Sequence, residues 1–157
     1  MKRLLTIILA GAAGSLLVPA GASALIQIDR GIAGARLGNT KAQVRAALGQ
    51  PAGIRNGMNE FGPFTVFRYA GGIRVTFQSG NRVTAAETTG RGDRTARGVG
   101  VGSTRRAVRQ RTPIVTCVPI PNGRICQTAA GLPGQRLTAF FIRNGRVTRV
   151  VVAFVID

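Results

Sequence analysis

The chain of 157 residues has no histidine, no tryptophan and a single tyrosine, and it sets only 5 acidic residues against 22 basic ones. Without histidine, a Ser-His-Asp or Cys-His arrangement is impossible, and zinc lacks its commonest ligand. The five carboxylates are scattered singly, so none is paired for general acid and base roles. No P-loop or strand–GxGxxG–helix pattern occurs. The sequence therefore predicts a protein that is not an enzyme, with no cofactor, no metal and no small-molecule substrate.

Long apolar runs are also scarce, and the one near the amino terminus has the pattern of a signal peptide. Lys2 and Arg3 give a positive start, and an apolar run follows over Leu4–Leu17. Ala22–Ala24 then offers a small-x-small cleavage site. A transmembrane anchor is the alternative, but the run is short for spanning a bilayer. We expect residues 1–24 to be cleaved after Ala24 and the rest of the chain to be secreted, outside the cytoplasm.

The scarcity of acids leaves a strongly basic protein. Without Lys2 and Arg3 the chain keeps 20 basic and 5 acidic residues, a net charge of about +15. A field of this sign favours anionic partners or surfaces. A GC-rich genome would also enrich arginine over lysine, but it does not explain the shortage of acids.

Only two cysteines are present, Cys117 and Cys126. An even number in an exported chain favours one disulfide. The intervening sequence places Pro121 and Asn122 at the centre of a tight turn, which would bring the two cysteines opposite each other across a hairpin. A redox-active pair would need C-x-x-C spacing. We therefore predict a structural disulfide within a hairpin over residues 115–128.

A short helix is predicted from Thr40 to Leu48. Thr40 and Gln43 have the spacing of a capping box, in which each side chain binds the other residue's backbone N–H. Val44, Ala47 and Leu48 lie on one apolar face. The sequence Gly-Gln-Pro that follows is typical of a helix end.

The same pattern returns in the second half of the chain, where it predicts a second helix over residues 104–111. Thr40 matches Thr104, and residues in other segments match at the same sequence offset. A constant offset in separate segments favours a tandem duplication. The other matching pairs are Gly38 and Gly102, Val44 and Val108, Phe77 and Phe141, and Val83 and Val147.

Between these helices and after the second one, the sequence alternates apolar and polar residues as half-buried strands do. We predict an α+β fold of two tandem repeats, each a short helix, or helix-loop-helix, packed on an antiparallel β-meander. The predicted parts are repeat 1 over 25–88 (a loop over 52–60, strands over about 63–87), a Gly/Arg-rich linker over 89–100, and repeat 2 over 101–157 (strands over about 137–156).

The sequence G-x-T-x-x-Q-V from Gly38, with L-G-x-P from Leu48 and a β-meander after it, resembles the repeat of small outer-membrane-assembly lipoproteins of the SmpA/OmlA type. The doubled arrangement in a secreted chain resembles the β-lactamase inhibitory protein. The resemblance implies a helix-loop-helix packed on an antiparallel sheet, twice, with a concave sheet surface that holds another protein. This chain carries no lipidated cysteine, and only its second repeat contains a disulfide pair.

Our first functional hypothesis is a secreted, non-catalytic protein-interaction module that binds a partner on its exposed sheet. An acidic protein would suit it best, and Arg68, Arg74 and Arg143 are the candidate contact residues. A third hypothesis, inhibition of a β-lactamase or related hydrolase, follows from the resemblance alone.

The second hypothesis is a binder of anionic envelope polymer or lipid surfaces. It depends on the bulk positive charge, and the second predicted helix carries a cluster of four arginines, Arg105, Arg106, Arg109 and Arg111. Nucleic acid is not the expected partner, because single-strand binders interleave stacking aromatics with their basic residues.

Overall fold

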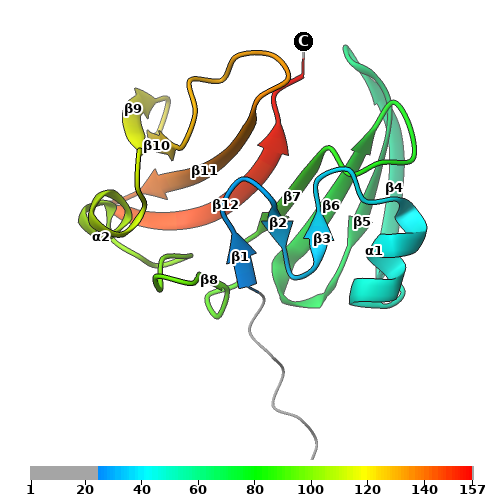
Figure 1. Ribbon diagram of the computed structural model, residues 1–157, viewed down its shortest axis with the longest axis horizontal. Coiled ribbons are helices and arrows are strands. Elements are labelled where there is room, and N and C mark those ends of the chain that lie inside the picture. Colours follow the sequence, from blue (N-terminus) through cyan, green and yellow to red (C-terminus); the bar gives the residue numbers. More distant parts are fainter. Residues whose placement is uncertain (1–24, 157) are drawn as a thin grey trace, which may run out of the picture.

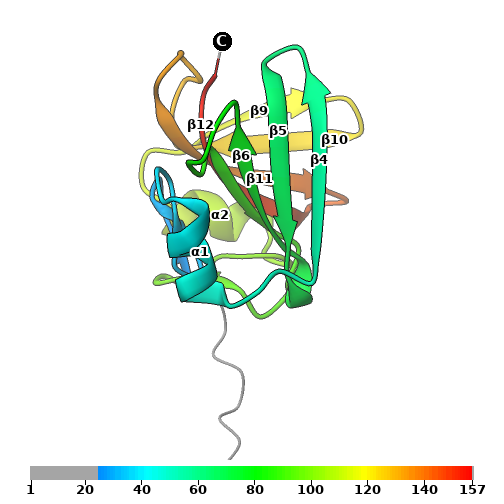
Figure 2. The same cartoon turned by 90° about the vertical axis from the view of Figure 1, so that its right-hand side faces the viewer.

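The computed structural model describes residues 25–156, which form a mixed α+β fold with two sheets (Figures 1 and 2). The large sheet is antiparallel and contains, in spatial order, β4 (Gly53–Asn59), β5 (Gly62–Arg68), β6 (Ile73–Gln78), β7 (Ala85–Thr88), β12 (Arg146–Phe154), β11 (Arg136–Arg143), β10 (Gly123–Gln127) and β9 (Thr116–Ile120). The small sheet contains β3 (Ala35–Arg36), β2 (Gly31–Ile32), β1 (Leu25–Gln27) and β8 (Arg94–Thr95). The helical elements are α1 (Lys41–Leu48), α2 (Arg105–Arg111) and the 3-10 turn η1 (Ala70–Gly72).

The mixed α+β class is thus as predicted. Neither α1 nor α2 has the length and apolar character needed to traverse a bilayer, and this finding extends only to residues 25–156. The predicted signal peptide, residues 1–24, lies outside the described residues.

Both predicted helices are present, each with a threonine cap. The Thr40 hydroxyl accepts a hydrogen bond from the Gln43 backbone N–H at 3.2 Å, and the Gln43 side chain accepts one from the Thr40 N–H at 2.8 Å. Thr104 accepts from the N–H of Ala107 at 3.2 Å. These bonds satisfy donors that the first helical turn leaves without backbone partners. The predicted capping box at the first helix is confirmed.

Each helix packs through one fully buried valine, Val44 in α1 and Val108 in α2. Leu48 is partly buried beside Val44, as the apolar stripe predicts. Ala47 is exposed, so its predicted place on the packed face is wrong. A helix of only two turns meets the sheet along a narrow strip, and Ala47 falls at its outer side.

The core lies between the large sheet and the layer formed by the helices and the small sheet. One cluster joins α1 and β3 to β5 and β6, and a second joins α2, β1 and β2 to β7, β10, β11 and β12. The largest fully buried side chains are Phe67, Phe77, Phe140, Ile26 and Ile32. With the exception of Ala139, the buried residues of the large sheet point to this core, so the opposite face of the sheet is free of the helices.

Three segments differ from the sequence predictions. Residues 52–60, predicted as a loop, contain β4, an edge strand that pairs along its whole length with β5 although nearly all its residues are exposed. Residues 89–100, predicted as a linker, contain β8 and buried side chains at Asp93, Thr95 and Val99. The described segment before Leu37 forms β1, β2 and β3, so residues 25–36 contain no additional helix of the kind the resemblance implies.

The match of Phe77 with Phe141 is also wrong by one residue. Phe77 is fully buried, whereas Phe141 is only partly buried and Ile142 takes the buried position. The ladder between β11 and β12 shifts register between Phe141 and Ile142. Along β11, Thr138, Phe140 and Ile142 face the core, so Phe141 points to the free face by ordinary alternation. The extra residue of the bulge is in β12, where Thr148 is skipped in the ladder.

Several hydrogen bonds recur with the offset that relates the two helices. Arg82 donates to the Gly38 carbonyl at 2.9 Å, and Arg146 donates to the Gly102 carbonyl at 3.0 Å. The backbone bonds that accompany them also recur, namely Gly38 to Val83 (2.9 Å) and Gly102 to Val147 (2.7 Å), and Lys41 to Asn81 and Arg105 to Gly145 (3.2 Å each).

The strand order of the large sheet reads alike from both ends, because β4–β7 and β9–β12 are each a four-strand meander and β7 pairs with β12. In that central ladder Ala86 pairs with Val152 and Thr88 pairs with Val150. The offset that relates Thr40 to Thr104 also relates Ala86 to Val150 and Thr88 to Val152, so it converts the first pair into the second. Glu87 and Val151 therefore lie opposite each other at the midpoint of the sheet.

Candidate functional site

The free face of the large sheet presents an extended surface of mixed polar and apolar side chains, here termed the open face. Strand register assigns its residues, since cross-strand partners point to the same side. They are Arg55, Phe64, Val66, Arg68, Arg74, Thr76, Gln78, Ala85, Glu87, Thr116, Val118, Ile120, Ile125, Gln127, Leu137, Ala139, Phe141, Arg143, Arg149, Val151 and Ala153.

Glu87 supplies the carboxylate near the centre of the open face and pairs with two arginines. Its Oε1 lies 3.0 Å from Nη1 of Arg74, and its Oε2 lies 3.9 Å from Nη1 of Arg149. These two contacts are the ion pairs found within residues 25–156. The two arginine side chains come from opposite halves of the sheet, so Glu87 links the halves electrostatically.

The sequence-predicted residues Arg68, Arg74 and Arg143 all lie on this face and are all exposed. Arg68 lies directly opposite Arg74 in the β5–β6 ladder, which places two like charges side by side. Arg143 lies at the end of β11 in the other half of the sheet. The structure therefore gathers the three on one face, two of them as neighbours and the third at a distance along the sheet.

Arginines on the open face are held over aromatic rings. The guanidinium of Arg149 lies 4.0 Å from the Phe141 ring centroid, and that of Arg55 lies 5.6 Å from the Phe64 centroid. Such stacking restricts the side chain while leaving N–H donors free for a partner. Arg149, Phe141 and Arg143 also line a shallow hollow of about 280 Å³.

Sequence reasoning missed Glu87 and Arg149. Strand alternation could have placed both on the free face, because each follows or precedes an apolar residue, Ala86 or Val150, that is fully buried. Their partnership is not visible in the sequence, since it requires the pairing of β7 with β12, and these strands belong to different halves of the chain.

The other predicted arginines, Arg105, Arg106 and Arg109, lie on α2. All three are exposed. They line a separate hollow of about 590 Å³ with Thr104 and Gly145. Because α2 packs against the buried side of the large sheet, this surface is not part of the open face. No carboxylate forms an ion pair with these three arginines among the described residues.

The remaining internal acids serve the fold. Asp29 accepts hydrogen bonds from the hydroxyls of Thr128 at 2.6 Å and Thr138 at 2.9 Å. Asp93 accepts one from the buried Thr88 hydroxyl. Within residues 25–156 no three His, Cys, Asp or Glu side chains lie close enough to hold a metal ion.

The predicted disulfide between Cys117 and Cys126 is confirmed. The two residues are cross-strand partners in the β9–β10 hairpin, whose turn residues are Pro121 and Asn122 as predicted. Cys126 is fully buried against the core. The bridge therefore fixes the edge strand β9 to β10.

Tyr69 follows β5 and has a buried hydroxyl without a hydrogen-bond partner among the described residues. Burial raises the pKa of Tyr69 above its usual value, and the positive charge of Arg45 counteracts part of this rise. Tyr69 packs beside the α1 core cluster and has a structural role there.

No protein-family model and no curated protein sequence matches the chain. Among solved structures it is similar to an extracellular SCP-domain protein from Bacillus anthracis (TM-score 0.50, 11% identity, 75% of this chain and 44% of that one). Others are a DUF4309 family protein from Bacillus subtilis (0.47, 18%, 74% and 78%) and a cysteine-rich secretory protein from Staphylococcus aureus (0.48, 7%, 75% and 44%). The chain thus spans less than half the length of two of these proteins, and the similarity concerns the fold alone.

Proposed function

We propose that this chain is a secreted, non-catalytic module that binds an acidic protein partner on its open face. The observation that carries this proposal is the excess of arginine over carboxylate on the open face. Arg74 and Arg149 flank the carboxylate of Glu87, Arg68 lies opposite Arg74, and Arg143 lies further along the sheet, with apolar side chains between them. Excess guanidinium groups on a half-apolar surface match a partner that presents carboxylates among apolar side chains.

The size of the open face supports the same proposal. Eight strands at about 4.8 Å spacing span roughly 34 Å, and strands of about six residues are near 20 Å long. The product, about 700 Å², is close to the roughly 800 Å² that each partner buries in a standard protein–protein interface. Stacked arginine and aromatic side chains are also the residue types enriched at such interfaces.

We also propose that the chain arose by internal duplication and is related in architecture to the β-lactamase inhibitory protein and the SmpA/OmlA-type repeat. The recurrence of the arginine–glycine and backbone hydrogen bonds with one constant offset supports the duplication. A sheet with one free face is the surface that the resemblance implies for holding another protein.

Site-specific crosslinking tests the binding proposal. A photoreactive amino acid at Thr76 on the open face and, as a control, at Ala46 on the exposed side of α1 would be irradiated in culture supernatant of the native organism. We expect Thr76 to capture one protein saturably at about 0.5 M salt, and Ala46 to capture none. The triple variant Arg68→Ala, Arg74→Ala, Arg143→Ala should lose the product. Equal capture from both positions would refute the proposal.

A second candidate function is favoured by the three arginines of α2, which have no carboxylate partner among the described residues. We propose that this surface, Arg105, Arg106 and Arg109, binds anionic envelope polymer or lipid. Sedimentation with vesicles containing phosphatidylglycerol would test it. Binding that falls steeply between about 50 and 200 mM salt, and that is lost in the α2 triple alanine variant but kept in the open-face variant, would support it.

Inhibition of a β-lactamase or related hydrolase remains a specific form of the first proposal. Titration of a purified class A β-lactamase with the mature chain would detect it as a stoichiometric loss of hydrolysis. The open-face triple alanine variant is the matched control, because an inhibitor that uses this face would lose potency in it.

A further inference from the structure

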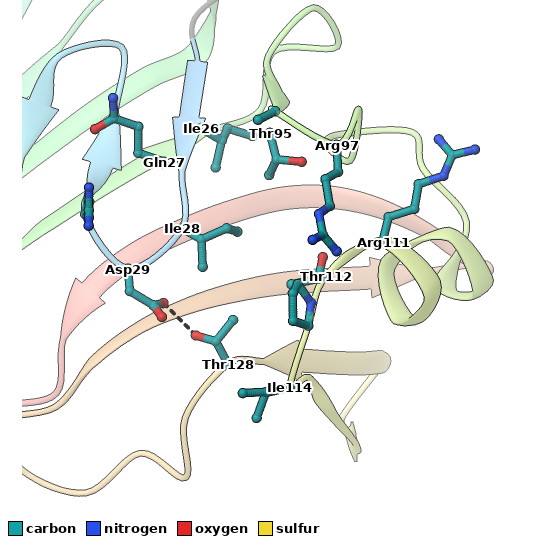
Figure 3. Close-up of a pocket in the computed structure, with 13 residues that line it drawn as sticks. Ile26, Gln27, Ile28, Asp29, Thr95, Arg97, Arg111, Thr112, Ile114 and Thr128 are labelled. Carbon is teal, nitrogen blue, oxygen red and sulfur yellow. Dashed lines mark hydrogen bonds between the residues drawn. The ribbon is translucent and has the colours of Figure 1, made fainter.

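A separate cavity of about 560 Å³ lies on the other side of the molecule from the open face, between the amino-terminal strands and the end of α2 (Figure 3). Its volume falls within the range of about 300–1,000 Å³ that is typical of small-molecule sites. Ile26 and Ile28, from the segment β1 and its continuation, form one apolar wall, and Ile114 extends the apolar lining beyond α2.

The cavity wall contains a buried hydroxyl with no partner. Thr112 is the residue that ends α2, and its backbone N–H donates to the Val108 carbonyl at 2.9 Å. Its side chain is only 3% exposed, and Oγ1 has no hydrogen-bond partner among the described residues. A buried hydroxyl without a partner is costly and uncommon in native proteins. Thr112 therefore lines the cavity with a hydroxyl that has no partner among the described residues and almost no accessible surface of its own.

The charged groups of the cavity are separated. In Figure 3 the Arg97 side chain extends toward the end of α2, where Thr112 lies, while Asp29 lies at the opposite end with Ile28 between them. Asp29 already accepts hydrogen bonds from two threonine hydroxyls. Arg111 adds positive charge on the side of Arg97, and its guanidinium lies close to Gly98. Arg30 follows Asp29 in the lining, so both signs of charge occur at that end, whereas the end at Arg97 and Arg111 has positive charge without a lining carboxylate.

The rim of the cavity shows backbone strain. Ile114 has a φ of 54°, a conformation that β-branched residues rarely adopt, and its side chain is 90% exposed. Strain of this kind is commonly found at ligand sites. The strained backbone holds a large apolar side chain at the cavity mouth, where a bound molecule would cover it.

We propose that this cavity binds an anionic amphiphile with a carboxylate head and an unbranched apolar tail. The Arg97 guanidinium binds the two carboxylate oxygens, and the Thr112 hydroxyl donates a further hydrogen bond to the same head. The tail lies along Ile26, Ile28 and Ile114. A carboxylate suits this end because a bidentate guanidinium and one hydroxyl satisfy a head with two oxygens.

Isothermal titration calorimetry of the mature chain with decanoate, kept below its micelle concentration, tests the proposal. We expect saturable binding with one decanoate per chain. Decanol, which has the same tail without the charge, should bind at least about tenfold more weakly, and decyltrimethylammonium should not bind measurably. Equal binding of decanoate and decanol, or the absence of saturable decanoate binding, would overturn the proposal.

Three variants locate the head group. Arg97→Ala should weaken decanoate binding about tenfold or more, whereas Arg36→Ala, which removes an exposed arginine from β3 outside the cavity, should change it less than twofold. Thr112→Val keeps the side-chain shape and removes the hydroxyl. It should weaken binding severalfold without lowering Tm, because the lost group has no partner in the free protein. Equal effects of Arg97→Ala and Arg36→Ala, or unchanged affinity in Thr112→Val, would contradict the assigned head-group site.

Discussion

Replacement of Glu87 by glutamine tests whether the ion pairs at the centre of the open face join the two halves of the sheet. Glutamine keeps the size of the side chain and a hydrogen-bond acceptor but removes the negative charge. Arg74 and Arg149, which now share the carboxylate at 3.0 and 3.9 Å, would then lie beside a neutral group. Arg68, opposite Arg74, would add an uncompensated repulsion.

The expected magnitude follows from exposure. The Arg74 and Arg149 side chains are 54% and 40% exposed, and Glu87 is 19% exposed, so solvent screens both pairs substantially. Pairs of this kind contribute about 0.2–1 kcal/mol each. We expect Glu87→Gln to lower the free energy of unfolding by about 1 kcal/mol, equivalent to a fall in Tm of roughly 3–5 °C for a domain of this size.

Thermal unfolding monitored by circular dichroism at low and high salt is the assay, with Glu60→Gln as the control. Glu60 lies in the exposed β4–β5 turn and forms no ion pair among the described residues, yet its replacement changes the net charge equally. At about 1 M salt, where the Debye length is near 3 Å, the difference between the variants should shrink by at least half. An equal fall in Tm for both variants at low salt would show that only net charge matters and would refute the reasoning.

Three further predictions concern stability. Cys117→Ala with Cys126→Ala should lower the free energy of unfolding in denaturant by about 2–3 kcal/mol, as expected for a bridge that closes a short loop; an unchanged denaturation midpoint would contradict this. Burial raises the pKa of Tyr69 in the folded state above its unfolded value near 10. The free energy of unfolding should therefore be retained below about pH 10 and decline as the pH rises through the folded pKa. Tyr69→Phe should remove this part of the decline without reducing stability at neutral pH. Thr40→Ala should lower the free energy of unfolding by about 1–2 kcal/mol and Thr104→Ala by about 0.5–1 kcal/mol, because only Thr40 takes part in a reciprocal capping box. If chemical denaturation gave the larger loss for Thr104→Ala, capping geometry would not decide these losses.

The sequence predicted those elements that are specified by residues close to one another in the chain. The capping box at Thr40 predicts the start of α1, and the tight turn at Pro121 and Asn122 predicts the disulfide hairpin. Both depend on residues that are near neighbours in the chain, so no distant segment is needed to specify them. The alternation of Ile73 to Gln78 predicts β6 with its bounds for the same reason.

Elements that depend on distant partners were not predictable in this way. The strand β4 has glycine and polar residues with no alternation, and it exists because its backbone completes the hydrogen bonds of β5. Residues 89–100 were predicted as a Gly/Arg-rich linker, but β8 pairs in parallel with β1, which lies far earlier in the chain. The bulge in the β11–β12 ladder, where β12 contains the extra residue Thr148, likewise arises from strand pairing and cannot be inferred from the alternation of β11.

The sequence by itself determined the mixed α+β class, the two capped helices, the disulfide hairpin and the basic character of the surface, because each of these follows from composition or from neighbouring residues. Only the tertiary structure decided which face carries each arginine. It joined β7 to β12, which set Glu87 between arginines from both halves of the sheet. It also formed a cavity beside Thr112 and Arg97 from four separate segments, residues 26–30, 95–97, 111–114 and 128. Such groupings depend on strand register and chain crossing, and these are set by burial of the whole core rather than by any local pattern.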